Sequence, residues 1–341
     1  MINVRVPAGR RRLPFYLALE EWVAMHLPAD DYFFTWIVSP TVICGRNQDI
    51  EKEVNIPYCR EHGIDIVRRR SGGGCVFADL NNIMVSFITP STEVQTTFRR
   101  LTDRVAEQLR RMGLDAVSGG RNDITIGERK ISGNAFYHLP GRSIVHGTML
   151  FDTDTAHMLN AITPSRAKLE SNRVQSVQSR IVTAHELRPE WTLDQFHAQL
   201  VSGLETGRYE LTAAEVLEVE AIEQNYYRPE WLQGVRATAA KGCRIGTASQ
   251  RIAGVGSVTA SVAIGRDGLM KGVSFTGDFF MDSDLDTEII SHLTGRAATE
   301  QAMAEALADA RTSAISGLSS EALVSLLAEC INSSNTESSN S

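Results

Sequence analysis

The sequence predicts an α/β protein of two domains, in which a large domain precedes a small α+β domain. The chain has 341 residues, which is more than one average domain contains. Helical and strand-like hydrophobic patterns alternate along it. The segment 226–246 mixes Pro229, Gly234 and Gly242 with short apolar runs, as is typical of a linker. We therefore expect domains over 1–240 and 247–331, followed by a Ser/Asn-rich disordered tail over 332–341.

Two segments of the first domain have clear helical patterns. Residues 14–26 begin with Pro14, which suits the first turn of a helix, and are rich in apolar residues. Residues 92–112 place apolar side chains three or four positions apart, and Gly113 follows as a C-terminal cap. Further helices are expected over residues 193–204, 213–224, 286–293, 300–307 and 320–330.

Strand patterns surround these helices. Residues 64–70 predict a strand that runs into a glycine-rich segment, and residues 124–131 predict a hairpin that turns near Gly127. In the strand expected over 143–151, alternation places Ile144, His146, Thr148 and Leu150 on one face. The second domain should contain two or three strands over residues 252–264 and 269–275.

The composition indicates a soluble protein of the cytoplasm. Apolar residues make up 43% and charged residues 22%, and the net charge of −7 argues against a nucleic-acid partner. No apolar run is long enough to span a membrane, and Glu20 and Glu21 interrupt the stretch that could resemble a signal peptide. Five scattered cysteines form no disulfide or zinc pattern, so a reducing compartment is expected; they are Cys44, Cys59, Cys75, Cys243 and Cys330.

The most distinctive motif is the glycine run after the strand at 64–70. Residues 68–77 read Arg-Arg-Arg-Ser-Gly-Gly-Gly-Cys-Val-Phe. Consecutive glycines let backbone N–H groups approach an anion such as phosphate, and an arginine adds a fork of donors. Strand alternation puts Arg69 on one face and Arg68 and Arg70 on the other, so all three cannot contact one ligand. Taken alone, the run is equally compatible with a flexible turn beside solvated charges.

Two further motifs follow. Gly120-Arg121-Asn122-Asp123 precedes Lys130-Ile131-Ser132-Gly133-Asn134-Ala135, and His146-Gly147-Thr148 lies on the strand at 143–151. A lysine held by a strand can bind a carboxylate and a phosphate oxygen together. Without their context, Lys130 would be an exposed hairpin residue and His146 a core histidine with its hydrogen bonds satisfied.

The order of these motifs resembles the lipoate–protein ligase family, within the wider group of biotin–protein ligases and octanoyl transferases. Gly45-Arg46-Asn47-Gln48 is also similar to the family's early Gly-Arg-x-Gln segment. The resemblance covers roughly residues 13–187 and is weaker beyond them. It implies a biotin/lipoate-ligase-like catalytic domain, of α/β class and built on a mixed sheet, with a small C-terminal accessory domain.

The resemblance also implies roles for individual residues. Lys130 would be catalytic and would contact both the lipoate carboxylate and the nucleotide phosphate. ATP or the acyl-adenylate would be bound by Arg69, Gly74, Cys75, Val76, Phe77, Asn122, Asp123 and Lys130. Lipoate would be bound by Ser71, Gly72, Gly73, Lys130, His146, Gly147 and Thr148. Asp123 is the candidate ligand for Mg²⁺.

The implied reaction uses ATP and Mg²⁺ to convert lipoic acid to lipoyl-AMP and then modifies a lysine of a lipoyl-carrier protein. The carriers would be acyltransferase domains of 2-oxoacid dehydrogenases or the glycine-cleavage carrier protein. One alternative is an octanoyl or lipoyl transferase that works through an acyl-cysteine, but no cysteine lies between Cys75 and Cys243. The other is a non-catalytic protein that binds an acyl group or a nucleotide. The sequence leaves open the preferred acid, the carrier, the base for the acceptor lysine and the oligomeric state.

Overall fold

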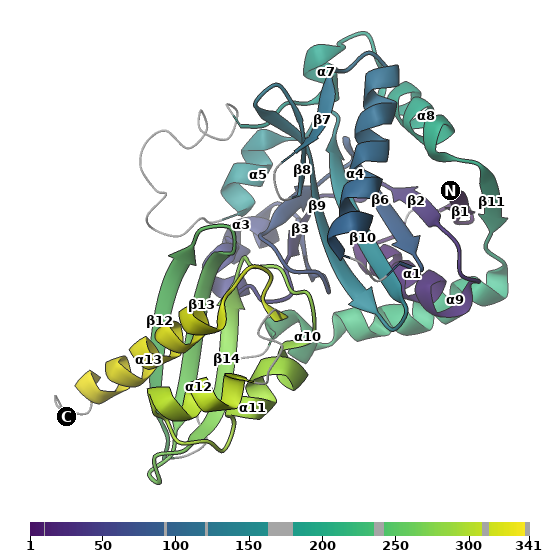
Figure 1. Ribbon diagram of the computed structural model, residues 1–341. Coiled ribbons are helices and arrows are strands. Elements are labelled where there is room, and N and C mark those ends of the chain that lie inside the picture. The colour runs from purple at the N-terminus through teal and green to yellow at the C-terminus, as the bar shows by residue number, and fades with distance from the viewer. Residues whose placement is uncertain are drawn as a thin grey trace. The chain divides into compact units, whose positions relative to one another are not determined.

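The computed structural model describes residues 1–9, 11–91, 94–119, 122–162, 180–234, 242–308 and 314–337. The chain divides into two compact units (Figure 1). The first comprises Met1–Cys44, Ile50–Arg70 and Cys75–Leu232, and the second comprises Gly45–Asp49, Ser71–Gly74 and Gln233–Ser341. Two short segments early in the chain are therefore grouped with the C-terminal unit.

The main sheet of the first unit has the strand order β11-β1-β2-β6-β10-β9-β8-β7 among the described residues. The pairs β1–β11 and β1–β2 are parallel, and the other pairs are antiparallel, so the sheet is mixed as expected. Its strands are β1 (Ile2–Arg5), β2 (Tyr32–Trp36), β6 (Asn82–Thr89), β7 (Ala116–Gly119), β8 (Asp123–Ile126), β9 (Arg129–Leu139), β10 (Arg142–Leu150) and β11 (Gly207–Glu210).

Helices cover both faces of this sheet (Figure 1). On one face, α1 (Leu13–His26) and α9 (Ala213–Glu223) pack in a core that includes Phe34, and on the other α4 (Val94–Arg111) and α8 (Leu193–Leu204) pack in a core that includes Phe33. Consecutive strand residues point to opposite faces, which is why these neighbours belong to different cores. Two short helices are α5 (Thr155–Ala161) and α7 (Ala184–Leu187).

The main helices agree with their sequence patterns. Helix α1 is buried from Leu13 to Ala24 and is apolar apart from Glu20 and Glu21, as expected for a helix enclosed by a core. Helix α4 is followed by Gly113, whose φ of 86° is the left-handed conformation of a C-terminal cap. Residues 92 and 93, where its pattern began, lie outside the described residues.

A second, smaller sheet of the first unit contains the strands that flank the glycine-rich segment in the sequence. It has the order β4-β3-β5, formed by β3 (Thr41–Cys44), β4 (Asp65–Arg68) and β5 (Val76–Ala78). Strand β3 is parallel to β4 and antiparallel to β5. The short helices α2 (Ile50–Glu53) and α3 (Ile56–Glu61) connect β3 to β4. The segment between β4 and β5 is the glycine run itself.

The end of the first unit differs from the expected linker over 226–246. Helix α9 is followed by a 3-10 turn, η2 (Gln224–Tyr227), and by α10 (Pro229–Gln233). Tyr226 is 5% exposed and packs in the core beside α1, so this stretch belongs to the first unit through Leu232. Residues 235–241 of the expected linker lie outside the described residues.

The C-terminal part of the second unit is a small α+β arrangement. An antiparallel sheet is formed by β12 (Arg244–Ile252), β13 (Gly256–Ile264) and β14 (Met270–Gly277). It shares a core with the π-helical turn η3 (Asp286–Ile290) and the helices α11 (Ser291–Leu293), α12 (Glu300–Ala308) and α13 (Ser320–Glu337). Gly246 lets α13 approach β12, because a Cβ there would lie 1.7 Å from the carbonyl oxygen of Cys330.

Helix α13 extends into the segment that was expected to be a disordered tail. The side chain of Ser333 accepts a hydrogen bond from the backbone of Thr247 in β12 and donates to the carbonyl of Thr247. Ser334 is 2% exposed and donates to the carbonyl of Ile331. These contacts give the Ser-rich residues partners that composition alone does not reveal, so the helix continues to Glu337.

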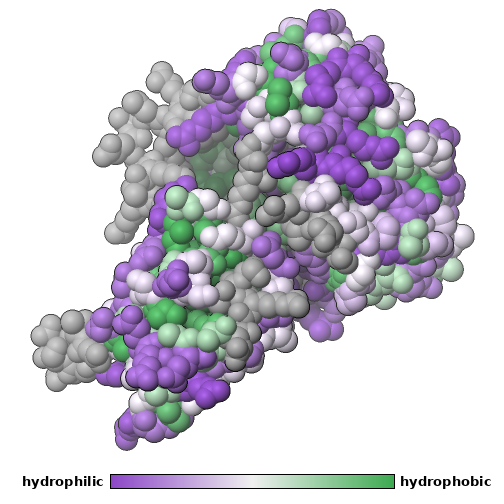
Figure 2. Space-filling model, viewed as in Figure 1, coloured by the Kyte–Doolittle hydropathy of each residue, from purple (hydrophilic) through white to green (hydrophobic). Residues whose placement is uncertain are grey.

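The surface in Figure 2 interleaves hydrophilic and hydrophobic residues over both units. Within the described parts of the chain, no helix combines the length and the apolar character that a membrane span requires.

Candidate functional site

The glycine run follows β4, and two of its glycines are required by the backbone around them. The N–H of Gly73 donates to the carbonyl oxygen of Phe279 at 2.9 Å, and Gly73 has a φ of 87°. A Cβ on Gly72 would lie 2.4 Å from the same oxygen. These residues all belong to the second unit. In this structure, the backbone of Phe279 therefore occupies the space that the absence of side chains on the two glycines leaves open.

Two of the three arginines stabilise the end of the first unit. The guanidinium of Arg68, which is 1% exposed, donates to the carbonyl of Leu232 at 3.0 and 2.9 Å, and Trp231 donates to the carbonyl of Arg68. Arg70 forms an ion pair of 2.7 Å with Glu21, and its guanidinium lies 5.3 Å from the ring centroid of Trp231. Arg68 and Arg70 thus share a structural role on one face of the strand.

Arg69 points the other way, as strand alternation predicts. It is 4% exposed and donates to the carbonyl of Ile43 at 2.9 Å. Burial lowers the pKa of Arg69 to about 10, which leaves the guanidinium charged at neutral pH. A cation with little surrounding water attracts an anion more strongly than an exposed one. Arg69 is thus a buried, charged guanidinium on the side of the chain away from Arg68 and Arg70.

The hairpin β8–β9 holds Lys130 beside Asp123. The Lys130 ammonium lies 2.7 Å from a carboxylate oxygen of Asp123, and both side chains are about one-third exposed, at 36% and 34%. The backbone of Lys130 donates to Arg180 and accepts from Val182, so a further segment fixes the strand on its other side. A Cβ on Gly133 would lie 2.5 Å from Cε and 2.7 Å from Nζ of Lys130. The lysine therefore lies over a glycine that leaves room for it.

The motif at 120–135 and the motif at 146–148 contact each other across neighbouring strands. Asn134 lies opposite Gly147 in the β9–β10 pairing, and a Cβ on Gly147 would lie 1.9 Å from the Asn134 side-chain oxygen. Asn134 donates from its backbone to the carbonyl of Asn122, and the Asn122 amide donates back to the carbonyl of Asn134. The hydroxyl of Thr148 accepts a hydrogen bond from the N–H of Gly133 at 3.3 Å.

Gly120 and Arg121, the first two residues of the motif at 120–135, lie outside the described residues.

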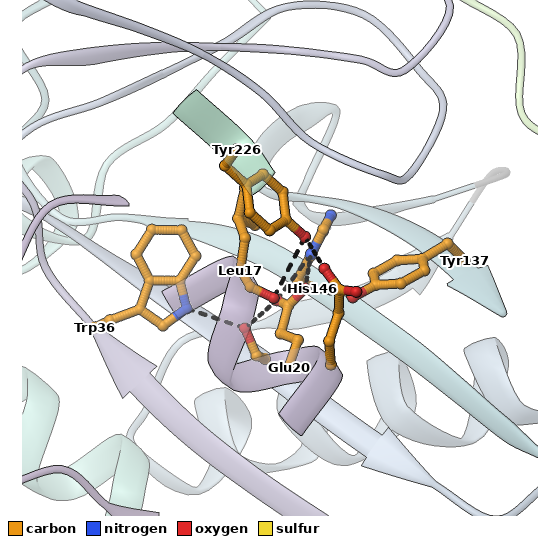
Figure 3. Close-up of polar contacts among 8 residues, drawn as sticks. Leu17, Glu20, Trp36, Tyr137, His146 and Tyr226 are labelled. Atoms are coloured by element: carbon orange, nitrogen blue, oxygen red, sulfur yellow. Dashed lines mark hydrogen bonds and ion pairs between the residues drawn. The ribbon is translucent and has the colours of Figure 1, made fainter. Parts of the chain in front are cut away.

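His146 forms part of a buried polar network with Glu20 (Figure 3). Glu20 is fully buried in α1, and its carboxylate lies 2.9 and 3.0 Å from Nδ1 of His146. The same carboxylate accepts hydrogen bonds from Ser86 at 2.5 Å and from Tyr137 at 3.2 Å, and Trp36 donates to Ser86. The histidine predicted to face the apolar core thus has a carboxyl partner there.

Glu21 extends this network toward the arginines. Tyr226 donates a hydrogen bond to Glu21, which also pairs with Arg70. Burial raises the pKa of Tyr137 and of Tyr226 well above the usual phenol range, and the negative charges of Glu20 and Glu21 raise them further. Both phenols therefore keep their protons and act as donors to the two carboxylates.

Comparison with protein families identifies the family to which this chain belongs. A model described as the lipoyl protein ligase A/B catalytic domain matches residues 13–205, more than half of the chain, and one described as the bacterial lipoate protein ligase C-terminus matches residues 247–327. The chain belongs to the lipoyl protein ligase A/B family. Lipoate-protein ligase LplJ of Bacillus subtilis is 31% identical over 302 residues, covering 85% of this chain and 89% of the relative.

Solved structures share the fold of this lipoyl protein ligase family member. P. falciparum LipL1, determined in complex with lipoate, superposes with a TM-score of 0.74 at 17% identity over 97% of this chain and 98% of its own. A lipoate-protein ligase A bound with ATP superposes with a TM-score of 0.60 at 23% identity over 69% and 99%. At these identities the likeness concerns the fold, and the ligands are those of the other two proteins.

Within this family member, the sequence motifs singled out His146 and Arg70 but missed their partners in α1, Glu20 and Glu21. Glu20 and Glu21 had been considered only as charges that break an apolar stretch. Two adjacent acidic residues in an otherwise apolar helix are a signal for buried polar partners, because a carboxylate is rarely buried unless it is hydrogen-bonded.

The surroundings of Asp123 show whether its carboxylate fits the role of a ligand for Mg²⁺. Among the residues that the structure describes, no three His, Cys, Asp or Glu side chains converge as a metal-binding group. Mg²⁺ that accompanies a nucleotide commonly takes only one or two protein carboxylates, and phosphates and water complete its shell. The single carboxylate of Asp123, 34% exposed beside Lys130, fits that mode of binding.

Proposed function

We propose that this protein activates lipoate with ATP and transfers the lipoyl group to a lysine of a carrier protein. The observation that carries the proposal is the placement of Lys130, which is held over Gly133 and 2.7 Å from Asp123 in a chain of the lipoyl protein ligase family. An ammonium fixed in this way can stabilise negative charge on a carboxylate and a phosphate together.

In the first step, the lipoate carboxylate attacks the α-phosphorus of ATP, the new P–O bond forms, and pyrophosphate leaves. Lys130 would hold the carboxylate and an α-phosphate oxygen and neutralise charge as it builds. Arg69 and the backbone of Gly74, Cys75, Val76 and Phe77 would contact the nucleotide, with Asn122 at its border. Mg²⁺, bound through Asp123 and the phosphates, would supply further positive charge to the leaving group.

In the second step, the ε-amine of the carrier lysine attacks the acyl carbonyl of lipoyl-AMP, an amide forms and AMP leaves. Ser71, Gly72, Gly73, His146, Gly147 and Thr148 are proposed to line the acyl site. The proposed carriers are lipoyl domains of 2-oxoacid dehydrogenase acyltransferases and the glycine-cleavage carrier protein, in the cytoplasm. The amine must lose a proton before it attacks, since an unperturbed lysine has a pKa of about 10.4.

The test is lipoate-dependent release of pyrophosphate from ATP and Mg²⁺ by the wild type and by Lys130→Ala. Lys271→Ala is a matched control, because Lys271 also pairs with an aspartate, Asp267, at 2.6 Å and is 39% exposed. We expect release to fall at least roughly 100-fold in Lys130→Ala and to be unchanged in Lys271→Ala. Acyl transfer from a carrier thioester with no pyrophosphate release would instead support the transferase alternative.

A further inference from the structure

Two cysteines face each other where the small sheet meets the glycine run. Cys44 is the last residue of β3, and Cys75 directly precedes β5. These strands are antiparallel with Ile43 opposite Val76, so the register places Cys44 opposite Cys75. Their sulfur atoms are 3.6 Å apart, and the thiol of Cys75 donates to the sulfur of Cys44.

The backbone at this position is compatible with a disulfide. Opposite residues of antiparallel strands have Cα atoms roughly 4.5 or 5.5 Å apart, and both values lie within the range of about 4.4–6.8 Å found in disulfides. The sulfurs would have to approach from 3.6 Å to about 2.05 Å.

The surroundings of the pair favour a thiolate. The hydrogen bond from Cys75 lowers the pKa of Cys44, and the charges of Arg68 and Arg69 lower it further, while burial opposes them. The same hydrogen bond and burial raise the pKa of Cys75. The pair therefore loses its first proton readily and keeps the second, which is shared along the bond between the sulfurs. Cys44 is fully buried, whereas Cys75 is partly exposed, so a small oxidant reaches Cys75 first.

We propose that Cys44 and Cys75 form a reversible redox site, which a hydroperoxide converts to a disulfide that slows lipoate activation. The proton of Cys75 passes along the hydrogen bond to the sulfur of Cys44 as the more exposed sulfur of Cys75 attacks the peroxide. An S–O bond forms as the O–O bond breaks, and the alkoxide or hydroxide leaves and takes up a proton. The sulfur of Cys44 then attacks the sulfenic acid of Cys75, the S–S bond forms, and water leaves. Two thiols are oxidised and one peroxide is reduced.

The effect of the disulfide on lipoate activation rests on the proposed function. Cys44 directly precedes Gly45–Asp49, and Cys75 directly follows Ser71–Gly74. The two segments are hydrogen-bonded through the N–H of Arg46 and the carbonyl of Ser71 at 2.9 Å. Drawing the sulfurs together displaces the ends of both segments, and the backbone after Ser71–Gly74 is the proposed nucleotide contact.

The disulfide is tested without reference to activity. The full-length protein is treated with a small excess of hydrogen peroxide, the peroxide is destroyed with catalase, and the protein is digested without reductant for mass spectrometry. We expect a peptide that joins Cys44 to Cys75 with the loss of two hydrogens and that separates after dithiothreitol. Cys59→Ala, which removes a buried neighbour and keeps the pair, should still form it. If wild type gives no such peptide, the redox site is refuted.

The effect on catalysis is measured as the ratio of pyrophosphate release before and after peroxide, in the wild type, Cys44→Ala and Cys75→Ala. We expect peroxide to lower the wild-type rate roughly tenfold, and the rate to recover after dithiothreitol and desalting. Peroxide should change the rate of each variant less than about twofold relative to the same variant before treatment. A cross-linked wild type with an unchanged rate would refute the effect on activation. If the untreated protein releases no pyrophosphate, the proposed function fails, and peptide mapping still decides the redox site.

Discussion

Replacing Gly133 with alanine should separate the position of Lys130 from the stability of the fold. The new Cβ would lie 2.5 Å from Cε and 2.7 Å from Nζ of Lys130. Ordinary carbon contacts begin at roughly 3.5 Å, so the lysine side chain must move by about 1 Å. A misplacement of that size can lower a rate about 100-fold. We expect kcat/KM for pyrophosphate release to fall roughly 10- to 100-fold, or about 1.4–2.7 kcal/mol.

The fold should tolerate this change. Gly133 does not have a positive φ, and the atoms that the methyl group meets first are the flexible end of a lysine. Alanine also restricts the unfolded chain, which stabilises the fold by about 0.4–1 kcal/mol where the conformation is compatible. We therefore expect the free energy of unfolding to change by less than about 1 kcal/mol. Gly119→Ala is the control, because a Cβ there meets nothing within 4 Å.

A double-mutant cycle refines the test. If Gly133 acts only through Lys130, then Gly133→Ala should have almost no further effect on the residual activity of Lys130→Ala. The reasoning fails if alanine at position 133 lowers the activity of both backgrounds by the same factor, since that would mean it disturbs something other than the lysine. It also fails if the single variant keeps full activity.

Two other outcomes follow from the structure. Gly147→Ala should lower the free energy of unfolding by about 1–3 kcal/mol in urea titration, because its Cβ would lie 1.9 Å from the Asn134 side chain; a change under about 0.5 kcal/mol would contradict this. Burial raises the pKa of Cys330 from 9.0 to about 11, so the unfolded thiol loses its proton between pH 9 and 11 while the folded thiol keeps it. Stability should fall with rising pH in that window, by up to roughly 2–3 kcal/mol more in the wild type than in Cys330→Ala, and equal losses would refute the assignment.

Local patterns were sufficient to predict much of this molecule. The turn of the β8–β9 hairpin at Gly127 and the separation of Arg69 from Arg68 and Arg70 both depend on neighbouring residues in the sequence. Ile144 packs in the core with α1, and Val145 packs in the opposite core, as alternation requires. Such features follow from strand period and turn chemistry, which act over a few residues.

Other features depend on residues far apart in the sequence, and no local pattern could reveal them. Glu20 meets His146 across 126 positions, and Arg68 meets Leu232 across 164. The contact of Gly73 with Phe279 is of the same kind, and it gives the glycine run a structural use that its sequence does not show. The motifs thus identified which residues to examine, while their partners came only from the fold.

The pairing of β1 between β2 and β11 affects how the main sheet can fold. Ile2 aligns with Tyr32 on one side but with Gly207 on the other, so the second pairing must close a loop of about 200 residues. During synthesis, one edge of β1 therefore stays open until residues 207–210 have emerged. The catalytic family match ends at residue 205, and a fragment cut there would keep that edge unpaired and prone to aggregation. A fragment that ends after Leu232 would retain β11 and the buried Tyr226.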